Sequence, residues 1–306
     1  MKSKKNVILK SINLLLISFL LSCRSCKEPF KRNPNLELLL KNDWDSFFNP
    51  VWAPNGEIIY YLRAHRENLP VEATQLAIGG ELWKININTK QKKFLLKGPF
   101  SSLSISPDGN LLALSYEREG SEIEWEGGPL ILADTLGNII DTLIKDSTFV
   151  QEVKFNSIGD YIYFFAIKYS EGKKQCGIYR IRIDGTEENL VKPIYDCYYR
   201  VNFYLDRNDS IYFGKGDFNY KKNLEAMIHG EVMLGPAELK IKELATNKIF
   251  IPDADPYGPP EADSGFESAY WSPDGEKLIL SVGKVESECS GTFVKNLELW
   301  ILHKVW

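Results

Sequence analysis

The chain has 306 residues, of which 44% are hydrophobic and 12% aromatic, so it is long enough to bury a sizeable core in one large domain or two small ones. Its formal net charge is −4, and no basic cluster follows the N-terminal segment. Because a nucleic-acid partner requires clustered Lys and Arg side chains, this distribution argues against one.

The first 22 residues have the features of an export signal. Four lysines precede an apolar stretch, Leu14 to Leu21, which is too short to span a bilayer as a mature helix. The ending Leu20-Leu21-Ser22-Cys23 resembles the lipobox of bacterial lipoproteins, where the signal is cut before a cysteine that carries the lipid. We therefore predict a signal peptide at 1–22, lipid attachment at Cys23 and a polar, proline-containing tether at 23–35. The alternative is an ordinary secretory signal followed by a coincidental cysteine.

Removal of this signal would take away four lysines and change the formal charge from −4 to −8. The lipoprotein resemblance implies three acyl chains, which exceed the two signals that stable membrane anchoring requires. Arg24 follows Cys23, in place of the Asp that retains many lipoproteins at the inner membrane. We therefore expect an outer-membrane protein that faces the periplasm or the cell surface.

A short motif that ends one apolar strand and begins the next recurs five times along the chain. Its fullest copy is Trp271-Ser272-Pro273-Asp274-Gly275, followed by an apolar strand from Lys277. The fifth position of each copy holds a residue type that adopts positive φ at low cost. A period of about 50 residues indicates a repeat architecture. The turn positions are Gly56, Gly109, Gly159, Asn208 and Gly275, at intervals of 53, 50, 49 and 67 residues.

Each repeat predicts four antiparallel strands. In the first repeat, the alternation from Glu81 to Ile87 indicates a third strand, and Lys93 to Leu96 a fourth. The last repeat has no fourth strand after Glu298 to Lys304, whereas a strand-like segment at Leu36 to Lys41 precedes the first repeat. We expect that segment to complete the last repeat, because an unpaired edge promotes aggregation. The sequence therefore predicts an all-β, five-bladed β-propeller of four-stranded blades, closed by the N-terminal strand, with six blades as the alternative.

Three long segments join second to third strands and should leave the blades at the same rim. Loops that a rigid scaffold gathers on one face commonly carry recognition. Neutral insertion is the equally weighted alternative. The three segments are Arg63 to Gly80, Glu117 to Gly128 and Gly216 to Pro236.

The repeated Trp-Ser-Pro-Asp-Gly motif, together with the Glu-Leu-Trp sequences at Glu81 to Trp83 and Glu298 to Trp300, resembles the TolB-like β-propeller family. The resemblance spans 36–306 and is most specific at Ile105 to Leu114 and Trp271 to Leu280. It implies a periplasmic binding or scaffolding module, and the best-known members have six blades. It implies no particular ligand, since one fold hosts many functions.

The sequence contains no catalytic, metal-binding or cofactor-binding motif, and His65, His229 and His303 have no second histidine at metal-ligand spacing. We therefore predict no catalytic residue, metal or cofactor. The alternative function is a glycan-active hydrolase or lyase, which would require inner-strand carboxylates around a central pocket. Five aspartates do not qualify because they lie in or beside the turns: Asp108, Asp160, Asp206, Asp209 and Asp274.

Four cysteines follow Cys23, and pairing is plausible in an oxidising envelope compartment. Cys176 begins the third strand of the third repeat, and Cys197 lies just after the fourth, so the intervening hairpin makes a disulfide between them a candidate. Cys26 and Cys289 have no partner that the sequence identifies.

These features predict a lipid-anchored envelope protein whose propeller, residues 36–306, binds another envelope protein through the loops of one face. A purely structural role in a larger assembly is a third possibility.

Overall fold

Every regular element that the computed structural model describes is a β-strand. The chain divides into a unit at Met1–Arg32 and a compact unit at Asn33–Trp306, which holds all the described strands. The signal peptide, Cys23 and most of the tether predicted from the sequence lie outside the described residues. Within the described ranges, no helix has the length and apolar character of a membrane span. These ranges are 32–65, 80–117, 127–145, 148–170, 173–195, 201–229, 237–257, 264–288 and 291–304.

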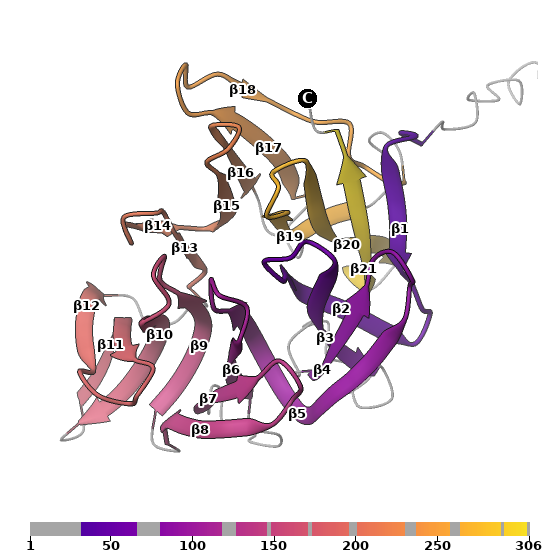
Figure 1. The fold of residues 1–306 in the computed structure, drawn as a ribbon. Helices are drawn as coiled ribbons and strands as arrows, with labels where there is room; N and C mark the ends of the chain where they lie inside the picture. The colour runs from indigo at the N-terminus through magenta and orange to yellow at the C-terminus, as the bar shows by residue number, and fades with distance from the viewer. Residues whose placement is uncertain are drawn as a thin grey trace, which may run out of the picture. The chain divides into compact units, whose positions relative to one another are not determined.

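The described strands form five hydrogen-bonded antiparallel sheets, in which neighbours follow the sequence order except at β1 (Figure 1). The seven-stranded sheet comprises β2 (Asp45–Trp52), β3 (Ile58–His65), β4 (Gly80–Asn86), β5 (Lys92–Ile105), β6 (Leu111–Glu117), β7 (Gly127–Asp134) and β8 (Ile139–Ile144). A four-stranded sheet comprises β9 (Thr148–Phe155), β10 (Tyr161–Ser170), β11 (Lys173–Arg182) and β12 (Asn189–Ile194).

The remaining strands form one short sheet and two four-stranded sheets. The short sheet is β13 (Phe203–Leu205) with β14 (Ile211–Phe213). The next comprises β15 (Lys215–Asn219), β16 (Leu224–His229), β17 (Glu238–Glu243) and β18 (Ile249–Phe250). The last comprises β19 (Ser264–Trp271), β20 (Lys277–Glu288), β21 (Gly291–His303) and β1 (Leu36–Leu40).

The seven-stranded sheet contains two repeats that share β5. Its first part pairs with β4 from Lys92 to Leu96, whereas its last part pairs with β6 from Phe100 to Ile105. The fourth strand of the first repeat therefore runs into the first strand of the second.

Strand β1 pairs with β21, with Leu36 opposite Leu302 and Leu38 opposite Trp300. This is the pairing that the sequence predicts for Leu36 to Lys41. The first and last repeats also share a buried cluster that includes Phe47, Tyr61 and Ile301.

Buried clusters lie between most neighbouring sheets, because the strands present apolar side chains to both sides. Leu62 and Leu103 belong to the cluster between the first two repeats, and Val153 and Leu130 to the next. Each fully buried Leu or Val contributes roughly 1.5–3 kcal/mol to stability. These shared clusters join neighbouring repeats to one another.

The fourth repeat differs from the sequence prediction. Gly216 to Pro236 was expected to be a long insert, but Lys215–Asn219 and Leu224–His229 are strands that pair with each other and extend through β17 to β18. The two strands before it form the separate short sheet β13–β14. The prediction of a single fourth blade is therefore wrong. A tight turn after Asn219 connects β15 to β16, and this turn lacks the Pro-Asp-Gly motif from which the other hairpins were predicted.

The repeated turns place a left-handed residue at one fixed position. Gly56, Gly109, Gly159 and Gly275 have φ between 71° and 89°. In the fourth turn, Asp209 takes this role with φ of 61°, so the assignment of Asn208 is corrected. The reason is that β13 ends at Leu205, so the turn begins one residue later, at Asp206. The hydrogen bond from the Asp206 N–H to the Ser210 carbonyl then closes a loop that is one residue shorter than in the other turns.

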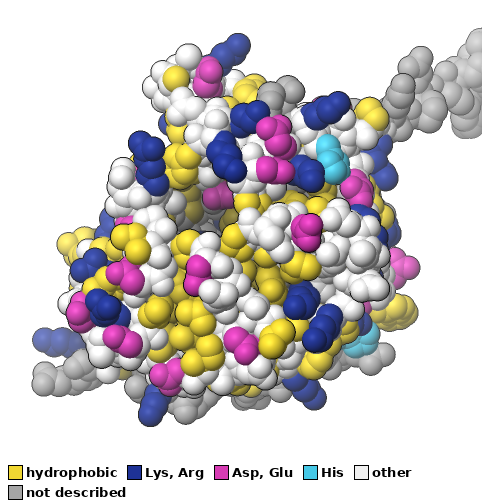
Figure 2. All heavy atoms as spheres, viewed as in Figure 1, with side chains coloured by type: hydrophobic (Ala, Val, Ile, Leu, Met, Phe, Trp, Pro, Cys, Tyr) yellow, Lys and Arg dark blue, Asp and Glu magenta, His cyan; other side chains and the backbone are white. Residues whose placement is uncertain are grey.

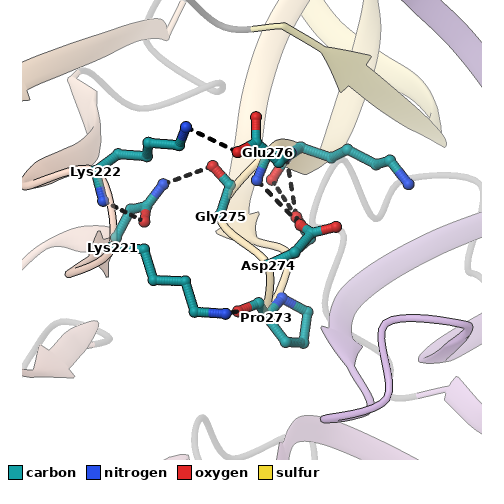
Figure 3. Close-up of polar contacts among 9 residues, drawn as sticks. Lys221, Lys222, Pro273, Asp274, Gly275 and Glu276 are labelled. Carbon is teal, nitrogen blue, oxygen red and sulfur yellow. Dashed lines mark hydrogen bonds and ion pairs between the residues drawn. The ribbon is translucent and has the colours of Figure 1, made fainter.

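Consecutive turns contact one another. A Cβ atom at Gly109 would lie 2.9 Å from Pro54 Cδ, and one at Gly159 would lie 3.0 Å from Pro107 Cδ. Between β15–β16 and β19–β20, the Asn219 amide donates to the Gly275 carbonyl at 2.8 Å (Figure 3). The motif therefore fixes the contact between repeats as well as the hairpin itself.

Candidate functional site

Several first strands carry an irregularity at the same place in the repeat. The register shifts at Asn49 in β2, Glu152 in β9 and Glu267 in β19, and Asn49 and Glu152 have positive φ of 46° and 38°. Each of these residues precedes the left-handed turn residue by seven or eight positions, as do Asn202 and Lys215. A bulge redirects a side chain from the regular alternation of a strand. Here the bulges bring polar side chains from different repeats together.

Six residues form what we call the inner-strand cluster. Its strands are β9, β15 and β19, which are far apart in the sequence. The Lys154 ammonium contacts Glu152 at 2.7 Å and donates to the Tyr270 hydroxyl at 3.3 Å. Lys215 forms an ion pair with Glu267. The members are Glu152, Lys154, Lys215, Asp217, Glu267 and Tyr270.

Asp217 supplies the extra charge of this cluster. Its carboxylate accepts from the Trp271 N–H at 2.8 Å and from the Phe218 N–H at 2.9 Å. Burial raises the pKa of Asp217 to about 6, although these two donors and Lys154 act in the opposite direction. Because the two Lys–Glu pairs cancel, ionisation of Asp217 changes the net charge of the cluster from zero to −1.

The same surroundings shift the pKa values of two other buried groups, Lys154 and Tyr270. Burial alone would lower the pKa of Lys154, but Glu152 and Tyr270 more than offset it and keep the pKa above its ordinary value. Burial raises the pKa of the Tyr270 hydroxyl, while Lys154 opposes the shift. Lys154 therefore stays charged and holds Tyr270 by a hydrogen bond and by a cation–π contact of 5.2 Å.

The cavity beside the cluster is small. Water centres can occupy about 20 Å³ of it, which is enough for about one ordered water. Ser268 lines this cavity, is 4% exposed, and its hydroxyl has no hydrogen-bond partner among the described residues. A bound water would satisfy that hydroxyl, whereas a sugar ring would not fit.

No protein-family model matches the chain, and no curated protein matches its sequence. The chain is similar in structure to TolB from Acinetobacter baumannii, at 14% identity over 87% of this chain and 57% of that chain, with a TM-score of 0.39. A putative TolB from Agrobacterium tumefaciens is 13% identical over 86% of this chain and 88% of that chain, with a TM-score of 0.37.

A further similar structure is an oligogalacturonate lyase in complex with manganese, at 12% identity over 87% of this chain and 67% of that chain, with a TM-score of 0.43. Because all three TM-scores are below 0.5, these similarities decide neither a ligand nor a reaction for this chain. The function has to be argued from its own residues.

No inner-strand carboxylate was identified from the sequence. The turn aspartates were considered and set aside, and Asp108 and Asp274 do serve the turns, each accepting from the serine two residues earlier at 2.5 Å. Glu152, Asp217 and Glu267 were missed. Aligning the repeats on their left-handed turn residues would have revealed Glu152 and Glu267, because both occupy the bulge position.

The predicted disulfide between Cys176 and Cys197 is not tested, because Cys197 lies outside the described residues. Cys176 is 2% exposed and disulfide-bonded, and the other four cysteines lie outside the described residues. It pairs with Ile194 across β11 and β12, three residues before Cys197. The partner remains a prediction, as does lipid attachment at Cys23.

The Glu-Leu-Trp sequences serve the strands that contain them. The Trp300 indole N–H donates to Glu298 at 3.0 Å, and the Trp83 indole N–H donates to Glu81 at 3.2 Å. Residues two apart on a strand share one face, so each glutamate satisfies the polar atom of its own tryptophan.

Two of the histidines lie beside carboxylates. His65 Nδ1 is 2.7 Å from buried Asp45, which also contacts Arg63 at 2.9 Å, and His303 Nε2 is 2.9 Å from Glu37. Neither pair belongs to the inner-strand cluster. Within the described part of the chain, no group of three or more His, Cys, Asp or Glu residues could hold a metal ion.

Proposed function

We propose that this chain is a lipid-anchored module of the cell envelope that binds another protein through the connections at one rim of its sheets. The observation that carries this proposal is the filled interior of the inner-strand cluster. Its four paired charges neutralise one another, and the neighbouring cavity takes about one water. The cavity beside this cluster therefore has no room for a large ligand, which favours recognition by the outer surface.

The connections between second and third strands favour one rim for this role. Strand pairs β3–β4, β6–β7 and β16–β17 are joined by 66–79, 118–126 and 230–236. All three connections start on the side opposite the repeated turns, because antiparallel strands alternate direction. A rigid scaffold that gathers long connections on one side is suited to bind a protein surface.

We further propose that the repeats form six blades. The contacts between first strands run from β2 to β5, β9, β13 and β15 and from β15 through β19 back to β2. Strands β15 and β16, which the sequence prediction lacked, form the additional blade together with β17 and β18. The short sheet β13–β14 would then be a blade reduced to its two inner strands.

A glycan-active enzyme is the less favoured alternative. Glu152 and Glu267 do come from two inner strands, but each contacts a lysine, and the cavity that both line takes about one water. A glycosidase requires one carboxylic acid and one carboxylate on either side of the bond that it cleaves.

Membrane anchoring is tested by fractionating cells that express Cys23→Ala. The variant should leave the membrane fraction, whereas the control Cys26→Ala should remain there. Retention of Cys23→Ala in membranes would contradict the lipid anchor.

Partner binding is tested by in-cell cross-linking of a variant in which a four-residue Gly-Ser link replaces 66–79. The link can close, because Gly80 lies directly against the backbone of Arg63. The partner should be lost, but it should be retained when the same four residues are inserted at the Asn88–Thr89 turn on the other rim. An unchanged set of cross-linked proteins would contradict the proposed rim.

A further inference from the structure

The cavity beside the inner-strand cluster contains a polar atom that no described side chain satisfies. Ser268, on β19, lines this cavity and is 4% exposed, and its hydroxyl has no hydrogen-bond partner among the described residues. Folded proteins satisfy nearly all such buried groups, and where no protein group does so a water or an ion takes that place. The Ser268 hydroxyl therefore indicates an occupant for the cavity.

Further oxygen acceptors line the same cavity. Glu152 and Glu267 each contact a lysine through Oε1, which leaves Oε2 of both as an acceptor. The Asn49 side chain donates through Nδ2 to the Ser101 carbonyl, so its Oδ1 is also available. The donor set thus combines hydroxyl, carboxylate and amide oxygens and contains neither imidazole nor thiolate.

This donor set and the size of the cavity narrow the kind of ion that fits. Oxygen ligands suit hard cations, whereas many transition metals prefer imidazole or thiolate. Mg²⁺ keeps several of its waters, and Ca²⁺ takes about six to eight oxygen ligands. The cavity holds only about one water, so neither divalent ion with its usual shell would fit. A single monovalent cation, which replaces one water, does fit.

The charge of the cluster favours a cation over a water. The two Lys–Glu pairs cancel, and the ionised Asp217 carboxylate adds one negative charge. Lys154 is the cation that acts on this carboxylate, but it is already paired with Glu152. The two groups that donate to Asp217 are backbone N–H groups and carry no charge. A water would satisfy the Ser268 hydroxyl and leave this buried charge, whereas a monovalent cation compensates it.

The charge imbalance is a property of the interior and is accessible to solvent ions. Positive and negative side chains are interspersed over the face that Figure 2 draws. The Lys215 and Glu267 side chains beside the cavity are 28% and 26% exposed, so an ion can reach it past this pair. The strands that line the cavity include β2, β9 and β19, which meet at the inner ends of the sheets (Figure 1).

We propose that this cavity binds one alkali cation, Na⁺ or K⁺, through the Ser268 hydroxyl and oxygens of Asn49, Glu152 and Glu267. The cation joins first strands of three repeats, so its binding stabilises the folded state relative to the unfolded state, in which these strands are apart. This site lies in the interior and goes beyond the proposed binding of a partner at the rim.

The test measures thermal unfolding of the full-length protein in detergent, in NaCl, KCl or choline chloride at equal ionic strength. The pH is 8, above the pKa of about 6 for Asp217. Choline is too large for a cavity that holds about one water, so it reports the effect of screening alone. The midpoint should be higher by about 2 °C or more in NaCl or KCl, and the shift should saturate as one site fills.

Two variants locate the ion. Ser268→Ala removes a ligand and Asp217→Asn removes the negative charge, and each should abolish the difference between the alkali salts and choline chloride. The matched controls should keep that difference. They are Ser281→Ala, whose buried hydroxyl donates to the Phe47 carbonyl, and Asp141→Asn on exposed β8. If a variant does not fold, broadening of the sodium NMR line by the wild type, reversed by added K⁺, tests the site without a substitution.

The opposite results are equally specific. Equal midpoints in all three salts, with no broadening of the sodium line, would overturn the proposal and leave an ordered water as the occupant. A salt-specific shift that survives in both Ser268→Ala and Asp217→Asn would place the ion elsewhere and would also overturn it. A larger shift in one of the two alkali salts would support the proposal and identify the preferred ion.

Discussion

The third repeat and the short sheet that follows it begin in the same way and end differently. Both have a first strand, a turn with a left-handed residue and a second strand, and a hydrogen bond of 3.0 Å from the Ser157 N–H to Asp209 joins the two turns. The third repeat then continues through β11 and β12, whereas the chain after Phe213 passes directly to β15. The turn and inner strands therefore suffice to place a repeat, and the outer strands can be absent.

The two regions are stabilised by different contacts. Phe164 is fully buried between strands of the third repeat, and its ring stacks on Tyr179 at 5.9 Å. Tyr212 in the short sheet is 40% exposed and depends on contacts with other rings. Where the outer strands are missing, aromatic stacking replaces part of the core.

The largest expected effect on stability is the difference between substitutions at Phe164 and at Tyr212. Phe164→Ala should lower the free energy of unfolding by about 3–5 kcal/mol, because it opens a cavity in a closed core. Tyr212→Ala should lower it by about 1 kcal/mol, since its ring is partly solvated and contributes mainly aromatic contacts. Urea unfolding followed by tryptophan fluorescence measures both. Equal losses would show that the short sheet has a core as complete as its neighbour.

The second effect concerns Asp217, which belongs to the inner-strand cluster and lies on β15, the strand directly after the short sheet. Its folded pKa of about 6 lies above the ordinary value of 3.8, so the folded state binds this proton more tightly than the unfolded state does. The resulting stabilisation is complete below about pH 4 and is lost as the pH rises through about 6. A difference of about two pKa units corresponds to roughly 3 kcal/mol.

Asp217→Asn should remove this dependence, and its stability relative to the wild type should therefore rise between pH 4 and 7. Urea unfolding at a series of pH values measures the slope. Asp141→Asn on the exposed strand β8 makes the same charge change and should leave the slope intact. A wild-type slope that survives in Asp217→Asn would place the titrating group elsewhere.

The sequence allowed the turns and the pairing of β1 with β21 to be predicted, because both follow from local rules. Positive φ favours glycine, and an unpaired strand needs a partner. Strands β15 and β16 were missed because their turn lacks the motif and places Asn223, with φ of 58°, at the left-handed position. A repeat whose turn departs from the consensus carries no periodic signal.

The candidate site was harder to predict than the fold. Glu152 and Glu267 look like ordinary strand residues in isolation, and only the bulges bring them to one cavity. Their pairing with Lys154 and Lys215 depends on which repeats are neighbours in space. The sequence order of β9, β15 and β19 alone does not contain that information.

The third effect compares two reasons why a glycine with positive φ is needed for stability. One is its contact with a neighbouring turn, and the other is the φ angle itself. Gly275 has φ of 77°, and a Cβ atom there would lie 2.5 Å from the Asn219 side chain. Gly214, between β14 and β15, has φ of 113° and would meet nothing within 4 Å. Gly275→Ala should therefore cost about 2 kcal/mol or more, and Gly214→Ala about 1 kcal/mol from backbone strain alone. Thermal unfolding compares them, and a larger loss for Gly214→Ala would reject the role of the turn contact.

The smallest effect concerns the ion pair beside the same turn. The Lys222 ammonium lies 2.8 Å from Glu276, but the two side chains are 36% and 53% exposed (Figure 3). Because water and salt screen such a pair, Glu276→Gln should change the free energy of unfolding by less than about 0.5 kcal/mol, and the change should vanish in 1 M salt.

Asn219→Ala is the positive control for that variant, since its side chain is 3% exposed and donates to the Gly275 carbonyl. Its loss leaves a buried carbonyl unsatisfied and should cost about 1–3 kcal/mol. Urea unfolding at low and high salt measures both variants. If Glu276→Gln cost as much as Asn219→Ala, the contact between these two repeats would depend on surface charge rather than on the buried amide. This junction would then differ from those at Gly109 and Gly159, where the side chain of a proline in the preceding turn packs against the glycine.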